Sequence, residues 1–104
     1  MGRRMREDRQ RLDKWLWFAR FAKSRTLASK LVASGFVRVD GRRTDDPAKA
    51  IAVGHVITLA LARTTLVIRV DDLGRRRGPA PEARLLYTEV GRDDGALVSD
   101  NPNR

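Results

Sequence analysis

Residues 11–43 read RLDKWLWFARFAKSRTLASKLVASGFVRVDGRR, and the fold is decided in this stretch. Its first part repeats apolar residues at helical spacing, which predicts an amphipathic helix over residues 11–21. The apolar positions are Leu12, Trp15, Leu16 and Ala19. The opposite side carries Asp13, Trp17 and Arg20, with Lys14 and Phe21 at its margin. We therefore expect the apolar stripe to face the core and the other side to face solvent.

A second helix is predicted from Ser24 to Ser34. The Ser24 hydroxyl can cap this helix by accepting from a free backbone amide of the first turn, and Gly35 favours its end. The apolar arc of the helix comprises Leu27, Ala28, Leu31 and Val32. The opposite arc comprises Arg25, Thr26, Ser29 and Lys30. One face should pack on the core, and the other should present hydrogen-bond donors.

Two hairpins are predicted after the helices. In FVRVDGRR, residues 36–43, alternating residues flank an Asp-Gly pair, which is the typical signal of a type I′ turn with Gly41 at positive φ. The cations on or beside this turn are Arg38, Arg42 and Arg43. Apolar runs at residues 56–61 and 66–70 predict the second hairpin. The expected fold is α+β, with an N-terminal helix pair packed on a small, mostly antiparallel sheet.

The remainder of the chain is expected to flank this domain. A length of 104 residues fits one hydrophobic core. We predict a flexible basic arm at residues 1–9, one domain at 10–73, and a basic linker with a short docked extension at 74–90. Residues 91–104 are polar and rich in Asp, Asn and Gly, so a disordered tail is predicted there.

The positive charge of the chain is segregated. The formal net charge is +9, and residues 1–43 contain 13 Lys and Arg against 4 Asp and Glu. Residues 44–104 contain 9 basic and 9 acidic residues, so the excess lies in the first part of the chain. A segregated charge produces a directional field that attracts phosphate. The alternative is a basic arm that is simply solvated.

Composition argues against several function classes. With no Cys and one His, the chain lacks the ligands of common metal sites and the nucleophiles of thiol chemistry. We therefore expect no metal, cofactor, small-molecule substrate or catalytic site, and we interpret His55 as a hydrogen-bonding loop residue. The sequence has no apolar run of membrane-spanning length and no secretory signal, so we expect a cytoplasmic protein. A mitochondrial presequence is the alternative, although Glu7 and Asp8 are unusual in one.

Taken in order, these signals resemble the S-four-type RNA-binding domain, also called the alpha-L motif, of ribosomal protein S-four. The resemblance covers about residues 10–70 and rests on RLDKWL at 11–16, Ser24-Arg25, Ala28, Leu31-Val32, Gly35, VRVDG at 37–41, Pro47 and VGH at 53–55. It implies a non-catalytic RNA-binding function. One alternative is a detached accessory subunit of an RNA-modifying enzyme such as a pseudouridine synthase. The other is a DNA or membrane-surface binder that uses the same charge.

A narrower resemblance exists within this family. Residues 11–21, together with Arg76, Pro79-Ala80 and Leu85-Leu86-Tyr87, resemble the small ribosome-associated heat-shock proteins. This resemblance implies binding to ribosomal RNA of the large subunit, in ribosome recycling or the heat-stress response. Such proteins usually continue into a long basic helix, whereas residues 91–104 are acidic and polar. We expect the chain to act as a monomer.

The resemblance implies RNA contacts for individual residues. Phosphate contacts are expected from Arg11, Lys14, Lys23, Arg25, Lys30, Arg42 and Arg43. Hydrogen bonds to phosphate or ribose are expected from Ser24, Thr26 and Ser29, and the predicted set is completed by Trp17, Arg20, Arg38, Asp40 and Gly41.

Several roles stay open at the level of sequence. Ser24 fits a cap as well as an RNA contact. Trp17 either stacks on an unpaired base or packs on the later linker, whereas Phe21 is expected to pack. Asp13 is a poor phosphate ligand, so we expect it to favour the helix N-terminus or to orient a neighbouring Arg. Arg75 to Arg77 either contact RNA or are solvated.

Overall fold

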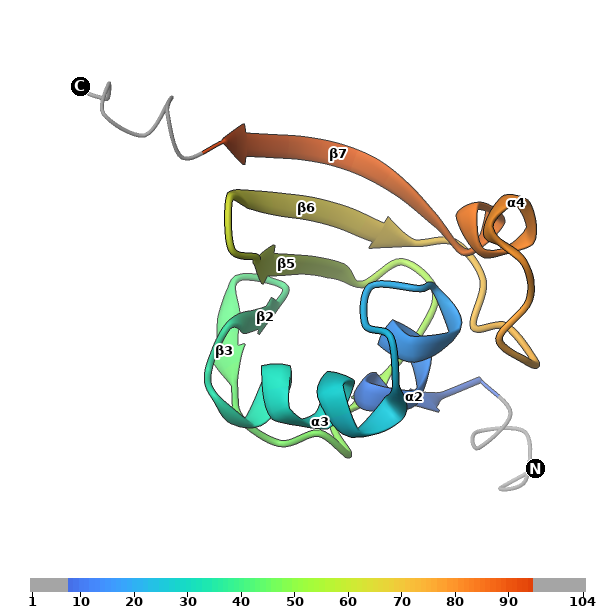
Figure 1. Cartoon of the computed structure of the whole chain (residues 1–104), viewed down its shortest axis with the longest axis horizontal. Helices are drawn as coiled ribbons and strands as arrows, with labels where there is room; N and C mark the ends of the chain where they lie inside the picture. Colours follow the sequence, from blue (N-terminus) through green and yellow to red (C-terminus); the bar gives the residue numbers. More distant parts are fainter. Residues whose placement is uncertain (1–7, 95–104) are drawn as a thin grey trace.

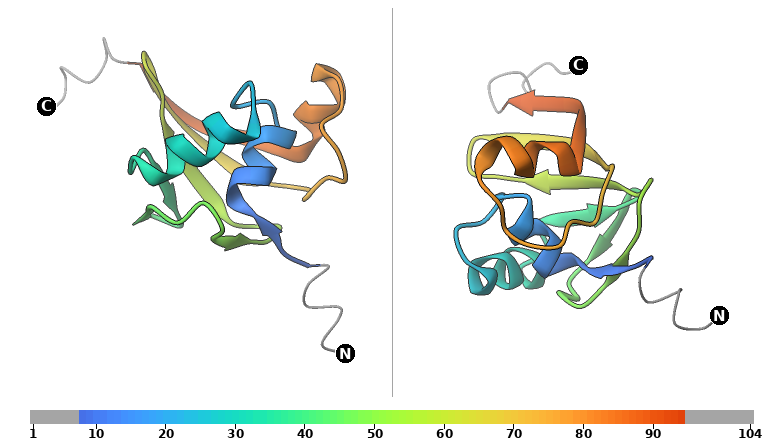
Figure 2. Two further views of the ribbon diagram at one scale, coloured as in Figure 1. Left: turned by 60° about the horizontal axis from the view of Figure 1, so that its bottom comes forward. Right: turned by 90° about the vertical axis from the view of Figure 1, so that its right-hand side faces the viewer.

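The computed structural model describes residues 8–94, in which α2 and α3 lie together on one face of a curved sheet (Figures 1 and 2). Residues 1–7 of the predicted arm and residues 95–104 of the predicted tail lie outside the described residues. No helix within residues 8–94 has the length and apolarity needed to cross a membrane.

The first helix, α2, spans Leu12–Phe18. The apolar periodicity predicted that it would extend to residue 21, so the helix ends earlier than expected. Arg20 takes the left-handed conformation with a φ of 67°. Its backbone N–H donates to the Trp17 carbonyl at 3.1 Å, and that of Phe21 donates to the Leu16 carbonyl at 2.9 Å. These bonds form a Schellman motif, a helix end that usually contains Gly at the left-handed position. Because this position holds Arg rather than Gly, the sequence does not indicate that α2 ends here.

The N-terminus of α2 is held by backbone rather than by a capping side chain. The amide of Leu12 donates to the Lys49 carbonyl at 2.9 Å, and that of Asp13 donates to the Pro47 carbonyl at 3.0 Å. A two-stranded pairing of β1 (Gln10–Arg11) with β4 (Ala50–Ile51) adjoins these bonds. The loop after the first hairpin therefore satisfies amides that a helix start leaves free.

The second helix, α3 (Arg25–Ala33), confirms the prediction at both ends. The Ser24 hydroxyl accepts from the Leu27 amide at 3.1 Å, which is the predicted cap. At the other end Gly35 has a φ of 86°, and its amide donates to the Val32 carbonyl at 2.9 Å. Glycine adopts this conformation without the steric cost of a Cβ, so the helix stops there.

Five antiparallel strands form the main sheet in the order β3-β2-β5-β6-β7. They are β2 (Val37–Val39), β3 (Arg42–Thr44), β5 (Val56–Ala60), β6 (Thr64–Val70) and β7 (Tyr87–Asp94). The pairs β2–β3 and β5–β6 are the two predicted hairpins, so the α+β class is confirmed. Asp40 and Gly41 have φ values of 51° and 83°, as a type I′ turn requires.

The segment after β6 differs from the predicted linker and tail. Its residues form α4 (Ala80–Ala83), the 3-10 turn η1 (Arg84–Leu86) and β7, which pairs with β6. The prediction of a disordered tail is wrong for residues 91–94, because they belong to β7. This strand lies at the sheet edge and carries a register shift opposite Val67 and Ile68. The sequence of β7, YTEVGRDD, also lacks the regular apolar alternation from which a strand is predicted, so the pattern did not indicate this strand.

The core joins the helix pair to the sheet and to the C-terminal extension. Trp15 is fully buried, and its indole N–H donates to the Asp72 carbonyl at 2.8 Å. The ring centroid of Phe21 lies 6.2 Å from that of Trp15 and 4.7 Å from that of Tyr87. Phe21 therefore packs, as predicted, and β7 contributes Tyr87 to an aromatic cluster around α2.

Candidate nucleic-acid interface

A buried carboxylate organises the contact between α2 and α3. Asp13 is 2% exposed and accepts from Arg11 twice, with Nε to Oδ1 and Nη2 to Oδ2 both at 3.1 Å. The Ser29 hydroxyl donates to Oδ2 at 2.7 Å, and Arg25 Nε lies 4.0 Å from the same oxygen. We call these four residues the Asp13 cluster. The predicted structural role of Asp13 beside a neighbouring Arg is confirmed, but its expected position facing solvent is wrong.

Opposing effects set the charge state of Asp13. Burial by itself raises the pKa of the Asp13 carboxyl. Hydrogen bonds from Arg11 and Ser29, the charge of Arg11 and the backbone N–H of Lys14 together outweigh burial, so the pKa lies below its ordinary value. The carboxylate is thus ionised at neutral pH. It holds the Arg11 guanidinium by two hydrogen bonds and lies within ion-pair distance of Arg25, and both guanidinium groups are about half exposed at the adjoining ends of α2 and α3.

Four of the predicted phosphate ligands are exposed and unpaired with carboxylates. They are Lys23, Lys30, Arg42 and Arg43, and the ion pairs found within residues 8–94 involve none of them. An unpaired cation can neutralise a phosphate and release the counterions condensed on the nucleic acid without first breaking an ion pair within the protein. We define the basic surface as these four residues together with Arg11 and Arg25.

The β2–β3 hairpin brings two of the predicted cations opposite each other. Arg38 and Arg43 are directly paired across the strands, an arrangement of like charges that costs stability in the absence of an anion. Arg38 Nη1 donates to the Gly41 carbonyl at 3.3 Å. The guanidinium of Arg43 lies against Gly35, where an added Cβ would be only 2.6 Å from Nη2. This close approach joins the hairpin to the end of α3.

Asp40 and Gly41 are the turn residues of the β2–β3 hairpin, and their contacts differ from those of the neighbouring cations. Asp40 Oδ1 accepts from the Val56 amide at 2.9 Å, so this carboxylate fixes the hairpin turn to β5. Oδ2 lies 3.9 Å from Nε2 of His55, whose Nδ1 accepts from the Ala52 amide at 3.1 Å. His55 is therefore a hydrogen-bonding loop residue, as predicted. Gly41 is exposed with open space around it, which leaves its backbone accessible.

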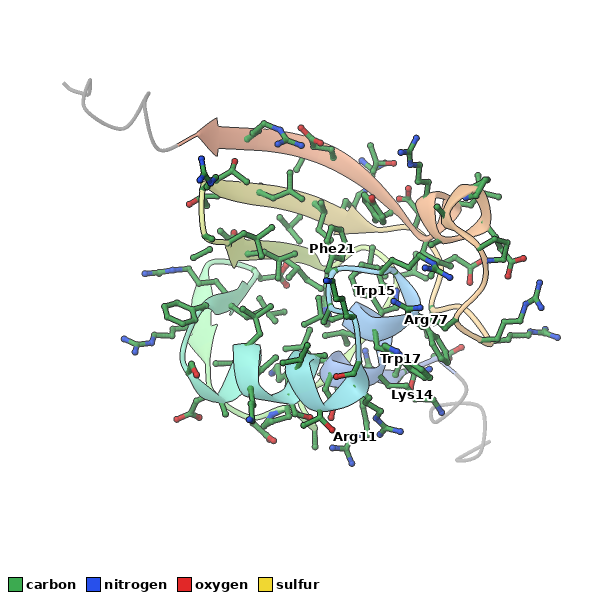
Figure 3. All side chains as sticks on the ribbon, in the orientation of Figure 1. Arg11, Lys14, Trp15, Trp17, Phe21 and Arg77 are labelled. Carbon is green, nitrogen blue, oxygen red and sulfur yellow. The ribbon has the colours of Figure 1, made fainter. Side chains whose placement is uncertain are left out.

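Trp17 packs on the segment that precedes α4, which is one of the two roles left open by the sequence. The Arg77 guanidinium lies 5.8 Å from the Trp17 ring centroid. Arg77 also donates from Nε to the Trp17 carbonyl at 3.1 Å and from Nη2 to the Ala22 carbonyl at 3.3 Å. Figure 3 shows Trp17 and Arg77 together, whereas Arg11 lies beside α3 at the lower edge of the molecule.

The remaining predicted residues lie on or next to α2 and α3. Arg20 Nε donates to the Gly78 carbonyl at 2.7 Å, so its side chain is held by the C-terminal segment. Lys14 Nζ lies 5.6 Å from the Phe18 ring centroid. Ser24 is the cap and Ser29 donates to Asp13, whereas Thr26 is exposed on α3. RNA contacts by these side chains stay predictions.

The sequence left open whether Arg75, Arg76 and Arg77 contact RNA or are solvated, because three consecutive arginines look alike in a sequence. Arg76 pairs with Glu82 at 2.7 Å, and Arg77 closes onto carbonyls that are 60 and 55 residues away in the chain. Arg75 is exposed. No local pattern distinguishes these three roles, because each depends on which distant group the folded chain brings near.

Comparisons with known proteins agree with this geometry. The S4 domain family matches residues 10–57. Heat shock protein 15 of Escherichia coli K12 is 40% identical over 80 residues, covering 77% of this chain and 59% of the relative. Small ribosomal subunit protein uS4 of Phytoplasma mali is 36% identical over 82 residues, covering 79% of this chain and 41% of the relative. The chain thus spans about three fifths of the heat shock protein and less of uS4.

A solved structure extends the likeness to three dimensions. Vibrio cholerae heat shock protein 15, described as trimeric, superposes with a TM-score of 0.75 at 41% identity, covering 79% of this chain and 82% of that chain. The chain belongs to the S4-domain family, as the sequence resemblance indicated. Within that family its similarity is to heat shock protein 15, whose Haemophilus influenzae homologue is also 40% identical over 86 residues, covering 83% of this chain and 65% of that relative.

Proposed function

We propose that this chain is a non-catalytic RNA-binding protein that grips structured RNA through the basic surface. The observation that carries the proposal is that four exposed cations have no carboxylate partner within residues 8–94, while Arg11 and Arg25 lie beside Asp13 in the Asp13 cluster. Membership of the S4-domain family supports RNA as the polyanion. Affinity then comes mainly from phosphate contacts, which are insensitive to base sequence.

The proposed target is ribosomal RNA of the large subunit, in ribosome recycling or the response to heat stress, which places the protein in the cytoplasm. The similarity to heat shock protein 15, together with the weaker similarity to a ribosomal protein, supports a ribosomal context. A rigid helix pair carrying cations suits an RNA whose phosphates are already ordered, because neither partner then loses much conformational freedom on binding.

Gradient sedimentation of a cell lysate at two salt concentrations, with sequencing of RNA crosslinked to the chain, tests this function. We expect co-migration with free large subunits that is lost at high salt, and crosslinks in ribosomal RNA. Absence from every ribosomal fraction would refute the ribosomal target. Co-purification with an RNA-modifying enzyme would instead favour a detached accessory subunit.

We further propose that the chain binds RNA as a monomer, since the basic surface is built from a single chain. Light scattering of the purified protein, alone and with a hairpin RNA, measures this directly. A mass of three chains would contradict the proposal and would match the trimeric description of the Vibrio cholerae relative.

A further inference from the structure

Phe36 is an exposed aromatic residue beside the hairpin cations. Its side chain is 51% exposed, and its carbonyl accepts from the Ala60 amide at 2.9 Å. This bond extends the β2–β5 pairing one residue beyond the pair Val37–Leu59. Because successive side chains in a strand alternate between faces, Phe36 lies on the face opposite the buried Val37. This is the outer face of the sheet, away from the helices, and it also carries Arg38.

Two arginines of the β2–β3 hairpin, Arg38 and Arg43, flank Phe36. Arg38 follows Phe36 by two residues on the same face, at a spacing of about 7 Å. Arg43 is directly opposite Arg38, and its guanidinium rests against Gly35, the residue before Phe36. The Arg43 guanidinium therefore lies near the start of β2, whereas the Arg38 guanidinium reaches the Gly41 carbonyl at the hairpin tip.

The neighbouring strand leaves the ring uncovered. Ala60 occupies the β5 position that faces Phe36, and it is exposed and small. Thr58 faces Arg38 on the same strand and adds a half-buried hydroxyl. The outer strip defined by Phe36, Arg38, Arg43 and Thr58 thus combines an open aromatic ring, two cations and a hydrogen-bonding group.

We propose that the outer strip is a binding site for one unpaired nucleobase, stacked on Phe36 with its adjoining phosphate at the Arg43 guanidinium, which lies near Gly35. This proposal rests on the proposed RNA-binding function and adds recognition of an unpaired nucleotide to it. Every base has an aromatic face, so stacking selects unpaired nucleotides without selecting a sequence. A phosphate at Arg43 also offsets part of the repulsion between Arg38 and Arg43 across the strands.

A single exposed Phe is common on a protein surface and by itself indicates no function. The residues around Phe36 distinguish it from such a case. Ala60, which faces it on β5, is small, and the nearby residues of the hairpin on this face are Arg38 and its partner Arg43 rather than apolar side chains that would hide the ring. A docking site for an apolar partner would be weakened by these charges. An unpaired nucleotide, which carries both a ring and an anion, matches both features of the strip.

The test uses two hairpin RNAs that differ only by a single unpaired uridine bulge in the stem. We expect the unaltered protein to prefer the bulged RNA. Phe36→Ala should lower affinity for the bulged RNA on the order of tenfold and leave the fully paired RNA unchanged. Phe36→Trp should restore the preference. Val53→Ala removes an apolar side chain of similar exposure (59%) outside the strip and is the matched control.

The outcomes separate this inference from the proposed function. Absence of salt-dependent binding to either RNA would refute RNA binding itself. Tight binding to both RNAs without a preference for the bulge would overturn the stacking site alone, as would an equal loss on both RNAs with Phe36→Ala. Equal melting temperatures for Phe36→Ala and the unaltered protein confirm that a lost preference does not reflect unfolding.

Discussion

Replacing Asp13 with Asn tests the link between the two helices. The carboxylate offers two charged oxygens, whereas the amide offers one neutral oxygen and places an NH2 group against either Arg11 or Ser29. The bond from Ser29 to a charged acceptor contributes about 1.5–3 kcal/mol. The pair with Arg11, a half-exposed partner that regains water, contributes about 0.5–1 kcal/mol. We therefore expect the free energy of unfolding to fall by about 2–4 kcal/mol.

Urea unfolding monitored by tryptophan fluorescence measures this loss, because Trp15 is fully buried in the folded protein. The matched control is Asp45→Asn, which changes an exposed carboxylate and should alter stability by less than about 0.5 kcal/mol. An equally small effect of Asp13→Asn would refute the assignment of Asp13 as the organising group.

The pH dependence of the same measurement has a defined sign. The folded pKa of Asp13 lies below its ordinary value of 3.8, so its contribution is fully present above that value. The contribution is lost as the pH falls through the lowered folded pKa. The stability difference between the unaltered protein and Asp13→Asn should therefore shrink on acidification below the ordinary value. A difference that stays constant through that range would contradict this linkage.

Three further predictions concern binding and the second half of the chain. Combining Lys30→Ala with Arg42→Ala should reduce the salt slope of RNA affinity by about 0.7–0.9 per lost phosphate contact, and an unchanged slope in filter binding would remove both residues from the basic surface. Arg77→Ala should lower the free energy of unfolding by about 1–2 kcal/mol, because two carbonyls lose their donors, whereas Arg75→Ala should have almost no effect in the same urea titration. Gly35→Ala should cost about 1–2 kcal/mol, since it forces a Cβ into a left-handed residue and toward Arg43, and a melting temperature equal to that of the unaltered protein would contradict this.

Much of the helix pair and both hairpins could be predicted because their signals are local. The cap at Ser24 acts on an amide three residues away, and Gly35 and Gly41 supply backbone angles that glycine adopts readily. The end of α2 could not be predicted, because Arg20 adopts a glycine-like conformation while its side chain is held by Gly78. β7 was missed for a related reason, since its pairing with β6 satisfies its backbone whatever its side-chain pattern.

The candidate site likewise combines features that could be predicted from the sequence with features that could not. Periodicity placed Arg25, Ser29 and Lys30 on the polar arc of α3. The structure agrees for Arg25 and Lys30, which are exposed, whereas Ser29 is half-buried and donates to Asp13. The same reasoning placed Asp13 in solvent, because a helical pattern treats a charged residue as outward-facing. Burial of Asp13 becomes favourable only when Arg11 and Ser29 converge on it, and Ser29 comes from the other helix.

By itself, the sequence determined the fold class, the segregated positive charge and the family, because these follow from residue types at short, regular spacings. Tertiary structure alone decided which cations are unpaired, which arginine closes onto Trp17, and that Phe36 lies beside Arg38 and Arg43 on an open face. The physical reason is that pairing energy depends on distance in space and on burial. Neither quantity is fixed until distant segments of the chain have packed together.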